Sequence, residues 1–238
     1  MIASFEHNFI FIKTRKTGGT TVEIALTPSC GPRDILTPIT MEDELLRLQD
    51  GKVAARNYVD DPALEAEIAA AVLQQDAARV RKLKRRSGRQ GGLHNHSPAA
   101  KIRSKLPKDF WDKAFKFTVE RHPYEKVVSG VYWGSRNDSP DDFSKLIDEK
   151  VAKRPEDMKL YSIGDDVVVD EILRQETLEA DLARLAEKFG LELPPRLPKA
   201  KGAFRTDRRP AHEILSPAQK AVIYERHRKT FDLLGYEP

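Results

Sequence analysis

The chain has 238 residues and a mass of 27.0 kDa, which fits one α/β domain or one domain with a helical insertion. With 39% hydrophobic residues, a single cysteine (Cys30) and no run of about 18 apolar residues, the composition excludes collagen, a coiled coil, a disulfide-stabilised mini-protein and a membrane span. The net charge of +4 suits a polyanionic ligand without requiring nucleic acid, and the first residues lack a signal-peptide cleavage site, so we expect a cytoplasmic protein.

The first half of the chain begins with a short strand pattern and continues with helical patterns. Residues 9–12 form an apolar run typical of a buried strand, and a polar turn leads from it into a helix at 20–26. Thr20 and Glu23 have the spacing of a capping box. A proline-rich loop follows at 28–38. Further helices are predicted at 41–48, at 61–86 with a break allowed, and at 98–106, and we expect the glycine-containing segment 87–92 to be mobile.

The second half of the chain continues the alternation of strands and helices. Residues 115–120 alternate apolar and polar side chains and predict a second strand. Pro123 suits the first position of the helix that follows, and a third strand is predicted at 167–174. The remaining helices are predicted at 143–151, at 178–189 before Gly190, and at 217–234. This alternation predicts an α/β fold with a parallel sheet and helices on both faces.

A polar turn, RKTGGTT at residues 15–21, joins the first predicted strand to the first predicted helix. The N-terminus of a helix offers backbone N–H groups and a partial positive charge, which bind phosphate or sulfate. Gly18 and Gly19 allow an anion to approach the backbone, and Lys16 adds a full charge. Because the lysine precedes the glycines and no Walker B aspartate is evident, the turn is not a Walker A loop, and we expect anion binding without an obligatory metal. An ordinary strand–turn–helix connection with a solvated lysine is the alternative.

Four segments, in the same order as in the family, resemble sulfotransferases that use 3′-phosphoadenosine 5′-phosphosulfate (PAPS), in particular their carbohydrate-type branch and its bacterial relatives. FIFIKTRKTGGTTVE resembles the 5′-phosphosulfate loop, and HNHSPAAKIR resembles the N-H-x-x-A segment. FKFTVERHPYEKVVSGVYW resembles the 3′-phosphate segment, and ILRQETLEADLARLAEKFGL resembles the R-x-E-x-L-x-x-D-L helix entry. The chain end, Phe231 to Tyr236, is similar to the family's F-x-x-x-G-Y. Many relatives have proline where Arg15 stands.

The resemblance implies a P-loop-like three-layer sandwich with a central parallel sheet, built as one sulfotransferase domain over 1–238 with a helical, basic insertion at about 37–92. It also implies that Lys16 contacts the phosphosulfate near the bridging oxygen, that the turn cradles the 5′-phosphate, and that a basic segment near residue 201 closes over the nucleotide. The implied cofactor-binding residues are Arg15, Lys16, Thr17, Gly18, Gly19, Thr20, Thr21, Arg121, Ser129, Lys201, Gly202 and Arg205. The alternatives are a structural ion pair for Arg121, a helix–helix contact for Ser129 and solvated surface charges for 201–205.

Transfer of a sulfuryl group from PAPS to a hydroxyl needs a cation at the leaving phosphate oxygen and a base for the hydroxyl proton. Lys16 supplies the cation. His96, which matches the histidine of the N-H-x-x-A segment, is the candidate base, and His94 is its rival and a candidate substrate contact. Glu176 is a further candidate base or substrate contact, or an acid that favours a helix dipole. The expected product is 3′,5′-adenosine bisphosphate, and no metal is expected.

The acceptor is a carbohydrate hydroxyl by resemblance, with a small alcohol, a phenol or a peptide tyrosine as alternatives. The basic run at residues 79–89 is interpreted as a solvated helix end, the other interpretation being a grip on an acidic glycan. Two other classes of protein are weighed against the sulfotransferase. A P-loop nucleotide kinase would need a Walker A loop and magnesium carboxylates. A basic nucleic-acid-binding module would bind with a strong dependence on salt and would not need Lys16 or Arg121.

Overall fold

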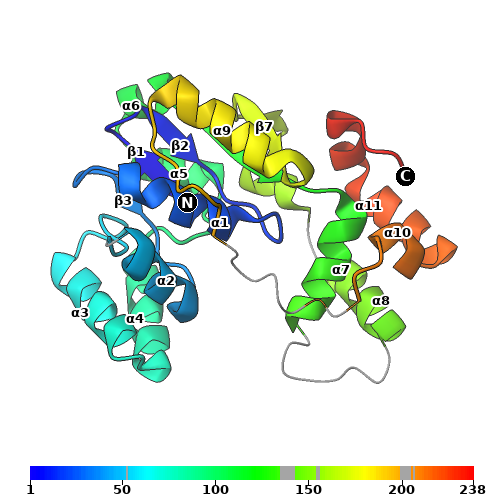
Figure 1. The fold of residues 1–238 in the computed structure, drawn as a ribbon, viewed down its shortest axis with the longest axis horizontal. Helices are drawn as coiled ribbons and strands as arrows, with labels where there is room; N and C mark the ends of the chain where they lie inside the picture. The colour runs from blue at the N-terminus through cyan, green and yellow to red at the C-terminus, as the bar shows by residue number, and fades with distance from the viewer. Residues whose placement is uncertain (52, 135–142, 154–155, 199–204, 206) are drawn as a thin grey trace.

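The structure is a computed structural model that describes residues 1–51, 53–134, 143–153, 156–198, 205 and 207–238. Its centre is a five-stranded sheet in the order β3-β1-β2-β4-β7 (Figure 1). The fold is therefore α/β, as the sequence predicts. The strands of this sheet are β1 (Ile2–Ser4), β2 (Phe9–Phe11), β3 (Ile35–Leu36), β4 (Phe115–Glu120) and β7 (Glu171–Arg174), and a separate hairpin is formed by β5 (Ser162–Ile163) and β6 (Asp166–Val167).

The sheet is mixed, whereas the sequence predicts a parallel one. β2, β4 and β7 run parallel, as expected for strands joined through helices, but β1 runs antiparallel to both β2 and β3. Strands as short as β1 and β3 have no detectable alternation of apolar and polar residues. For that reason the sequence predicts a loop at 28–38, where the structure has β3. The third predicted strand, 167–174, is divided, because Val167 pairs with β5 and only β7 joins the central sheet.

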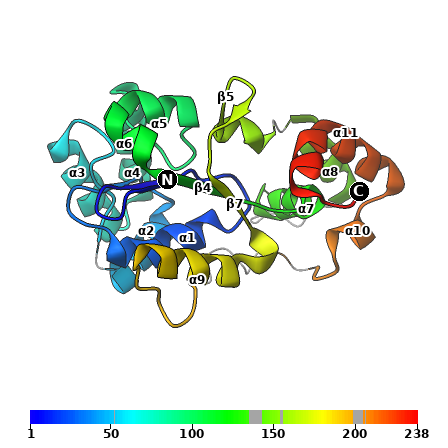
Figure 2. The ribbon, with the colours of Figure 1, turned by 90° about the horizontal axis from the view of Figure 1, so that it is seen from above.

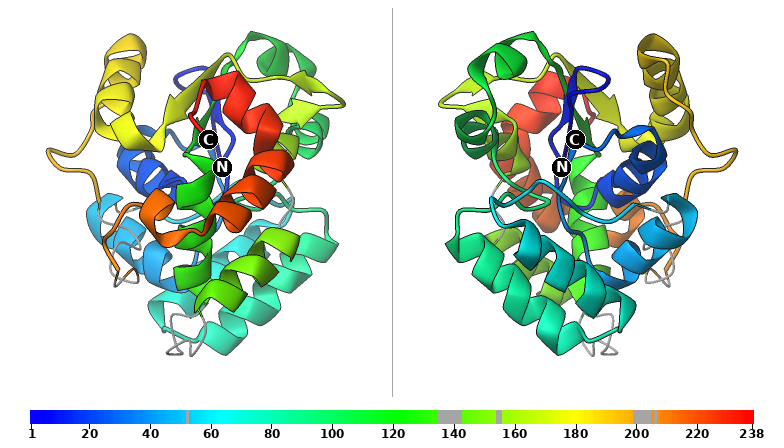
Figure 3. Two further views of the ribbon diagram at one scale, coloured as in Figure 1. Left: turned by 90° about the vertical axis from the view of Figure 1, so that its right-hand side faces the viewer. Right: turned by 90° about the vertical axis from the view of Figure 1, so that its left-hand side faces the viewer.

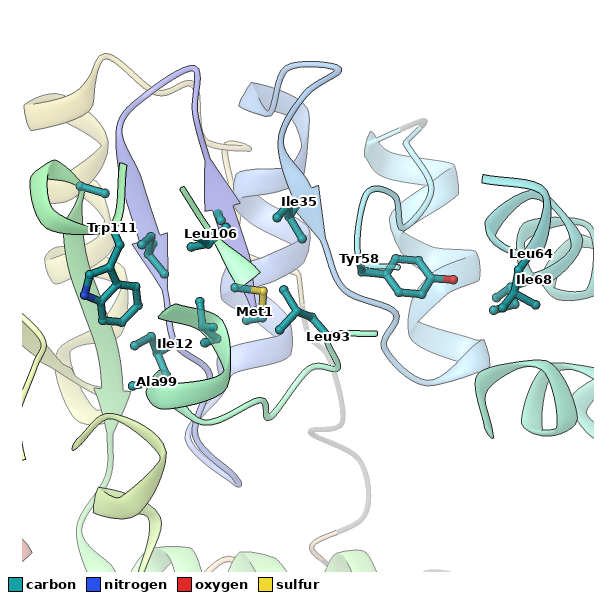
Figure 4. Packing of buried hydrophobic residues seen from close by; sticks show 14 of the residues in the cluster. Met1, Ile12, Ile35, Tyr58, Leu64, Ile68, Leu93, Ala99, Leu106 and Trp111 are labelled. Carbon is teal, nitrogen blue, oxygen red and sulfur yellow. The ribbon is translucent and has the colours of Figure 1, made fainter. Parts of the chain in front are cut away.

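Both faces of the sheet are buried under helices. Phe9 and Phe11 point to the face covered by α1 (Gly19–Leu26) and α9 (Leu178–Phe189), which Figure 2 shows on one side of the sheet. Ile10 and Ile12 point to the opposite face, where α5 (Ala99–Lys105) and α6 (Lys108–Lys113) supply Ala99, Ile102 and Trp111. Figure 4 shows Ile12, Ala99 and Trp111 of this cluster. A strand that is buried on both faces reads as a continuous apolar run, which is why 9–12 was recognisable.

Among the described residues, three α-helices follow α1 and precede α5 in the chain, and Figure 1 shows them at one end of the molecule: α2 (Met41–Gly51), α3 (Pro62–Leu73) and α4 (Ala77–Arg89). The helix predicted at 61–86 is thus two helices. Gln75 has a positive φ of 55°, and the Asp76 side chain accepts the Arg79 N–H at 2.9 Å, so a new helix begins there. The segment predicted to be mobile at 87–92 begins with the last turn of α4.

The other end of the molecule is helical, as Figure 3 shows with α11 in red. α7 (Pro123–Gly134) begins directly after β4, with Pro123 at its first position as predicted, and packs against α8 (Phe143–Lys153), α10 (Ala211–Ile214) and α11 (Pro217–Leu234). Their shared core contains Tyr124, Val127, Val128, Val131, Ile147, Ile223 and Phe231. None of the helices in the described segments combines the length and the apolarity that crossing a membrane requires.

Candidate functional site

The turn at residues 15–21 connects β2 to α1 through an unusual backbone. Lys16 has a φ of 63° and Gly18 a φ of 81°, so the chain is left-handed at two positions just before the helix. Gly19 has no room for a side chain, because a Cβ there would lie 2.8 Å from Cγ of Lys13. The turn is therefore tightly folded over Lys13, and its conformation depends on both glycines.

The predicted capping box at Thr20 and Glu23 is wrong. No side chain caps α1, which begins after Gly18. Instead, the buried Lys13 ammonium donates to Thr20 Oγ1 at 2.9 Å and forms an ion pair with Glu23. Burial opposes the ionisation of Glu23, but Lys13 and the Met1 amino group outweigh it and lower the pKa of Glu23 to about 2. Glu23 therefore stabilises the turn through its ion pair with Lys13, which in turn binds Thr20.

The threonine hydroxyls of the turn are bound to other protein groups. Thr17 Oγ1 lies 2.9 Å from Thr14 Oγ1, and both residues are buried. Thr20 accepts from Lys13, and Thr21 Oγ1 donates to the Pro198 carbonyl at 3.0 Å. The first N–H groups of a helix lack an acceptor within the helix. A phosphate at this turn would therefore be bound mainly by backbone N–H groups and by lysine.

Arg15 is tied to a buried carboxylate from a distant part of the chain. Asp157, at the start of the short helix η2 (Asp157–Leu160), accepts the Arg15 backbone N–H at 3.0 Å and lies 2.6 Å from Nη1 of Arg15. Lys126 of α7 joins Asp157 at 3.0 Å and Glu120 at the end of β4 at 2.7 Å. Although burial opposes its charge, Glu120 and Asp157 raise the pKa of Lys126. These ion pairs link the turn to α7.

One face of α7 carries a row of polar and aromatic side chains at intervals of four residues. Glu125, Ser129 and Trp133 are half-buried and lie on this face, while the intervening apolar residues pack into the helical core. Arg121, just before the helix, donates from Nη2 to Glu125 Oε2 at 3.0 Å. Arg205 comes from the C-terminal part of the chain and donates to the same oxygen at 2.6 Å. Two of the three arginines predicted to bind the nucleotide therefore share Glu125, the residue one helical turn before Ser129.

Lys16 connects the turn to the same face of α7. Its ammonium lies 4.7 Å from the centre of the Trp133 ring. Trp133 is one turn beyond Ser129, and Glu125 and Trp133 are about 12 Å apart along a helix axis. The two predicted phosphate-binding segments therefore meet along one side of a single helix.

The histidine segment contacts the base of the turn. His96 Nδ1 lies 3.0 Å from the Lys13 carbonyl oxygen, which can only accept, so Nδ1 carries the proton and Nε2 is the basic atom. Burial first, and the nearby Lys13 charge second, lower the pKa of His96 to about 3. His94 is exposed, and its Nδ1 accepts the His96 backbone N–H at 3.2 Å. His96 is thus a neutral imidazole beside the turn.

Of the remaining predicted residues, the structure describes Glu176 but not Lys201 or Gly202. The carboxylate of Glu176 accepts the His122 backbone N–H at 2.9 Å and the Tyr236 hydroxyl at 3.1 Å, so both oxygens have protein partners. Lys201 and Gly202 lie outside the described residues.

Three residues of this region were not predicted. Glu125 and Trp133 continue the four-residue spacing from Arg121, a signal the sequence does contain. Asp157 gives no such local signal, because its partners lie far away in the chain.

Within the described segments, no group of three or more histidine, cysteine, aspartate or glutamate side chains is arranged to hold a metal ion. Comparisons with protein-family models, with curated proteins and with solved structures found no match. The function therefore has to be argued from the residues themselves.

Proposed function

We propose that the protein is a PAPS-dependent sulfotransferase with a P-loop-like three-layer fold, and that it transfers the sulfuryl group to an acceptor hydroxyl, most simply that of a carbohydrate. The observation that carries the proposal is the contact between Lys16 and Trp133. It places the turn after β2 one helical turn from Ser129, on the face of α7 that begins at the paired Arg121 and Arg205. A lysine at one end of this helix face and an arginine pair at the other suit a nucleotide that is phosphorylated at both ends.

The arginine pair suits the 3′-phosphate. Two guanidinium groups share the Glu125 carboxylate, and Glu176 is a second acidic neighbour of Arg121. Arg121 Nε is buried and has no hydrogen-bond partner among the described residues, so this guanidinium is not fully satisfied by the protein. A phosphate dianion would supply acceptors here, and Ser129 lies one helical turn beyond Glu125.

In the proposed reaction, the acceptor oxygen attacks sulfur in line, forming the new O–S bond while the bond from sulfur to the 5′-phosphate oxygen breaks. Lys16 and the N–H groups at the start of α1 stabilise the charge on the leaving phosphate. His96 Nε2 takes the hydroxyl proton, which is consistent with the tautomer fixed by the Lys13 carbonyl. The products are the sulfate ester and 3′,5′-adenosine bisphosphate.

A thermal-shift titration tests the proposal. A ligand that binds only the folded state raises the melting temperature, so 3′,5′-adenosine bisphosphate should stabilise the protein, and ATP with magnesium should not. Lys16→Ala and Arg121→Ala should each weaken the stabilisation about 10–100-fold in concentration, as expected for the loss of a charged hydrogen bond. Arg208→Ala, which removes an exposed arginine from the segment of Arg205, is the control. Stabilisation by ATP with magnesium alone would indicate a kinase instead.

A further inference from the structure

The basic excess of the chain is concentrated in one helix. α4 contains seven of the 41 basic residues and no acidic residue, so the rest of the chain has 34 basic and 37 acidic residues and a formal charge of −3. Its basic residues are Arg79, Arg81, Lys82, Lys84, Arg85, Arg86 and Arg89. A field of one sign on a single helix is a distinct surface feature rather than a general property of this protein.

Most of these cations face solvent without acidic partners. α4 packs on α3 through Val80 and Leu83, which leaves its opposite side to the basic side chains. Arg81, Arg85 and Arg89 are exposed and follow one another at intervals of four residues, so they form a single stripe. Within the part of the chain that the structure describes, the only exposed α4 cation with an acidic partner is Arg86, beside Asp61 and Glu67.

This stripe is unfavourable for the isolated helix. Like charges four residues apart on a helix repel each other, and no neighbouring carboxylate compensates the stripe within the described residues. A bound polyanion would remove the repulsion. Arginine forks spaced about 6 Å apart along the axis can each bind a carboxylate or sulfate group in bidentate geometry.

The basic surface continues from the end of α4 toward the histidines. Beyond Arg89, a Cβ on Gly91 would lie 3.3 Å from the Lys105 ammonium, and Lys101 donates to the Gly92 carbonyl at 2.7 Å. The chain then reaches His94, whose pKa is lowered first by burial and next by nearby positive charges that include Lys101. Lys105 and Lys101 therefore lie beside the segment that joins the end of α4 to His94.

We propose that α4 is a binding surface for an acidic polysaccharide, which lies along the Arg81–Arg85–Arg89 stripe and extends toward His94 and His96. The placement of an acceptor hydroxyl at the histidines rests on the proposed sulfotransferase function, whereas binding to the stripe does not. A polysaccharide fits better than a single-stranded nucleic acid, because α4 contains no aromatic side chain on which a base could stack.

The test is direct binding of fluorescently labelled alginate, a linear polyuronate, to the full chain in the absence of any nucleotide. The stripe variant R81Q/R85Q/R89Q is compared with R184Q/R196Q/R228Q, which removes the same charge from exposed arginines elsewhere. We expect the stripe variant to bind alginate at least tenfold more weakly, with a slope of log K against log salt reduced by about 2–3, by analogy with nucleic acids. The control variant should stay within twofold of the wild type.

Two outcomes would overturn the proposal. Equal loss of alginate binding in both variants would mean that net charge alone matters, and tighter binding of oligo(dT) than of alginate at equal charge would indicate a nucleic-acid surface. A melting temperature of the stripe variant equal to or above that of the wild type shows that it folds, since the substitutions remove repulsion within α4. A failure of the sulfotransferase proposal would appear separately, as a lack of stabilisation by 3′,5′-adenosine bisphosphate.

Discussion

Arg121 and Arg205, which are far apart in the sequence, bind the same carboxylate oxygen: Oε2 of Glu125 lies 3.0 Å from Nη2 of Arg121 and 2.6 Å from Nη1 of Arg205. The other oxygen of Glu125 accepts the Ala211 backbone N–H at 2.7 Å. Glu125, in the first turn of α7, thus binds two arginine side chains and one backbone N–H. It therefore holds the C-terminal part of the chain and the end of β4 in one arrangement.

Replacing Glu125 by alanine tests whether this carboxylate helps or hinders the binding of 3′,5′-adenosine bisphosphate. By simple electrostatics, removing a negative charge should strengthen the binding of an anion. We expect the opposite, a loss of affinity for 3′,5′-adenosine bisphosphate of about 10–100-fold, because the two arginines lose the charged hydrogen bonds that orient them. Isothermal titration calorimetry measures the effect, and Glu187→Ala, an exposed acid on α9, is the control. Tighter binding by Glu125→Ala would mean that Glu125 competes with the phosphate instead of positioning its ligands.

The contact between Lys16 and Trp133 predicts a fluorescence signal for the nucleotide. When Lys16 moves from the ring to a phosphate, the environment of Trp133 changes. We expect 3′,5′-adenosine bisphosphate to change the intrinsic emission of the wild type and of Trp111→Phe, which removes the buried tryptophan of the sheet core. The change should vanish in Trp133→Phe and, at saturating nucleotide, in Lys16→Ala. A change that persists in Trp133→Phe would contradict this arrangement.

The parts of the fold that the sequence predicted are those with strong local patterns. β2 and β4 are recognisable because one is an unbroken apolar run and the other alternates, and Pro123 marks the start of α7. The two or three residues of β1 and β3 are too few to show a period, so the antiparallel part of the sheet was missed.

The candidate site, like the fold, was predictable only where a local sequence pattern marks it. Lys16 and Arg121 belong to local motifs that can be recognised by their spacing. The contact of Lys16 with Trp133 and of Arg15 with Asp157 depends on tertiary packing across more than a hundred residues, and no local pattern encodes it. The prediction of a capping box was wrong for the same reason. Lys13 is buried beneath the turn and binds the side chains of both Thr20 and Glu23.

His96→Ala should separate catalysis from binding. The variant should bind 3′,5′-adenosine bisphosphate as the wild type does, because His96 contacts the Lys13 carbonyl and not the arginine cluster. Its kcat should fall by about 10²–10⁴-fold, the usual contribution of a general base. The matched control is His94→Ala, with a change below about threefold. A large loss in His94→Ala together with a small one in His96→Ala would transfer the role of base to His94.

The depressed pKa of His96 predicts the pH profile. Burial, assisted by the Lys13 charge, lowers this pKa from its ordinary value of 6.5 to about 3, so the imidazole is neutral, with an unprotonated Nε2, throughout the range from pH 5 to pH 8. The profile of kcat/KM, which reports the free enzyme, should therefore be flat between pH 6 and pH 8 and should decline only under more acidic conditions. An acid limb with a midpoint near 6.5 that disappears in His96→Ala would contradict this assignment.

Asp157 is expected to support both stability and the shape of the turn. Asp157→Ala leaves the buried Lys126 paired with Glu120 alone among the described carboxylates and releases Arg15, so we expect the free energy of unfolding to fall by about 3–5 kcal/mol in denaturant titrations, as for other broken buried ion pairs. Arg15→Ala separates the two effects, because the Arg15 side chain is 36% exposed and its loss leaves the pair of Lys126 and Asp157 intact. This variant should lose little stability but raise KM for PAPS several-fold, since the residue next to Lys16 is no longer held at its side chain.

If Arg15→Ala leaves KM unchanged while Asp157→Ala raises it at temperatures where both variants are folded, the backbone N–H of Arg15, which Asp157 also binds at 3.0 Å, carries the positioning alone. If neither variant changes KM, Asp157 contributes to stability and has no part in shaping the turn.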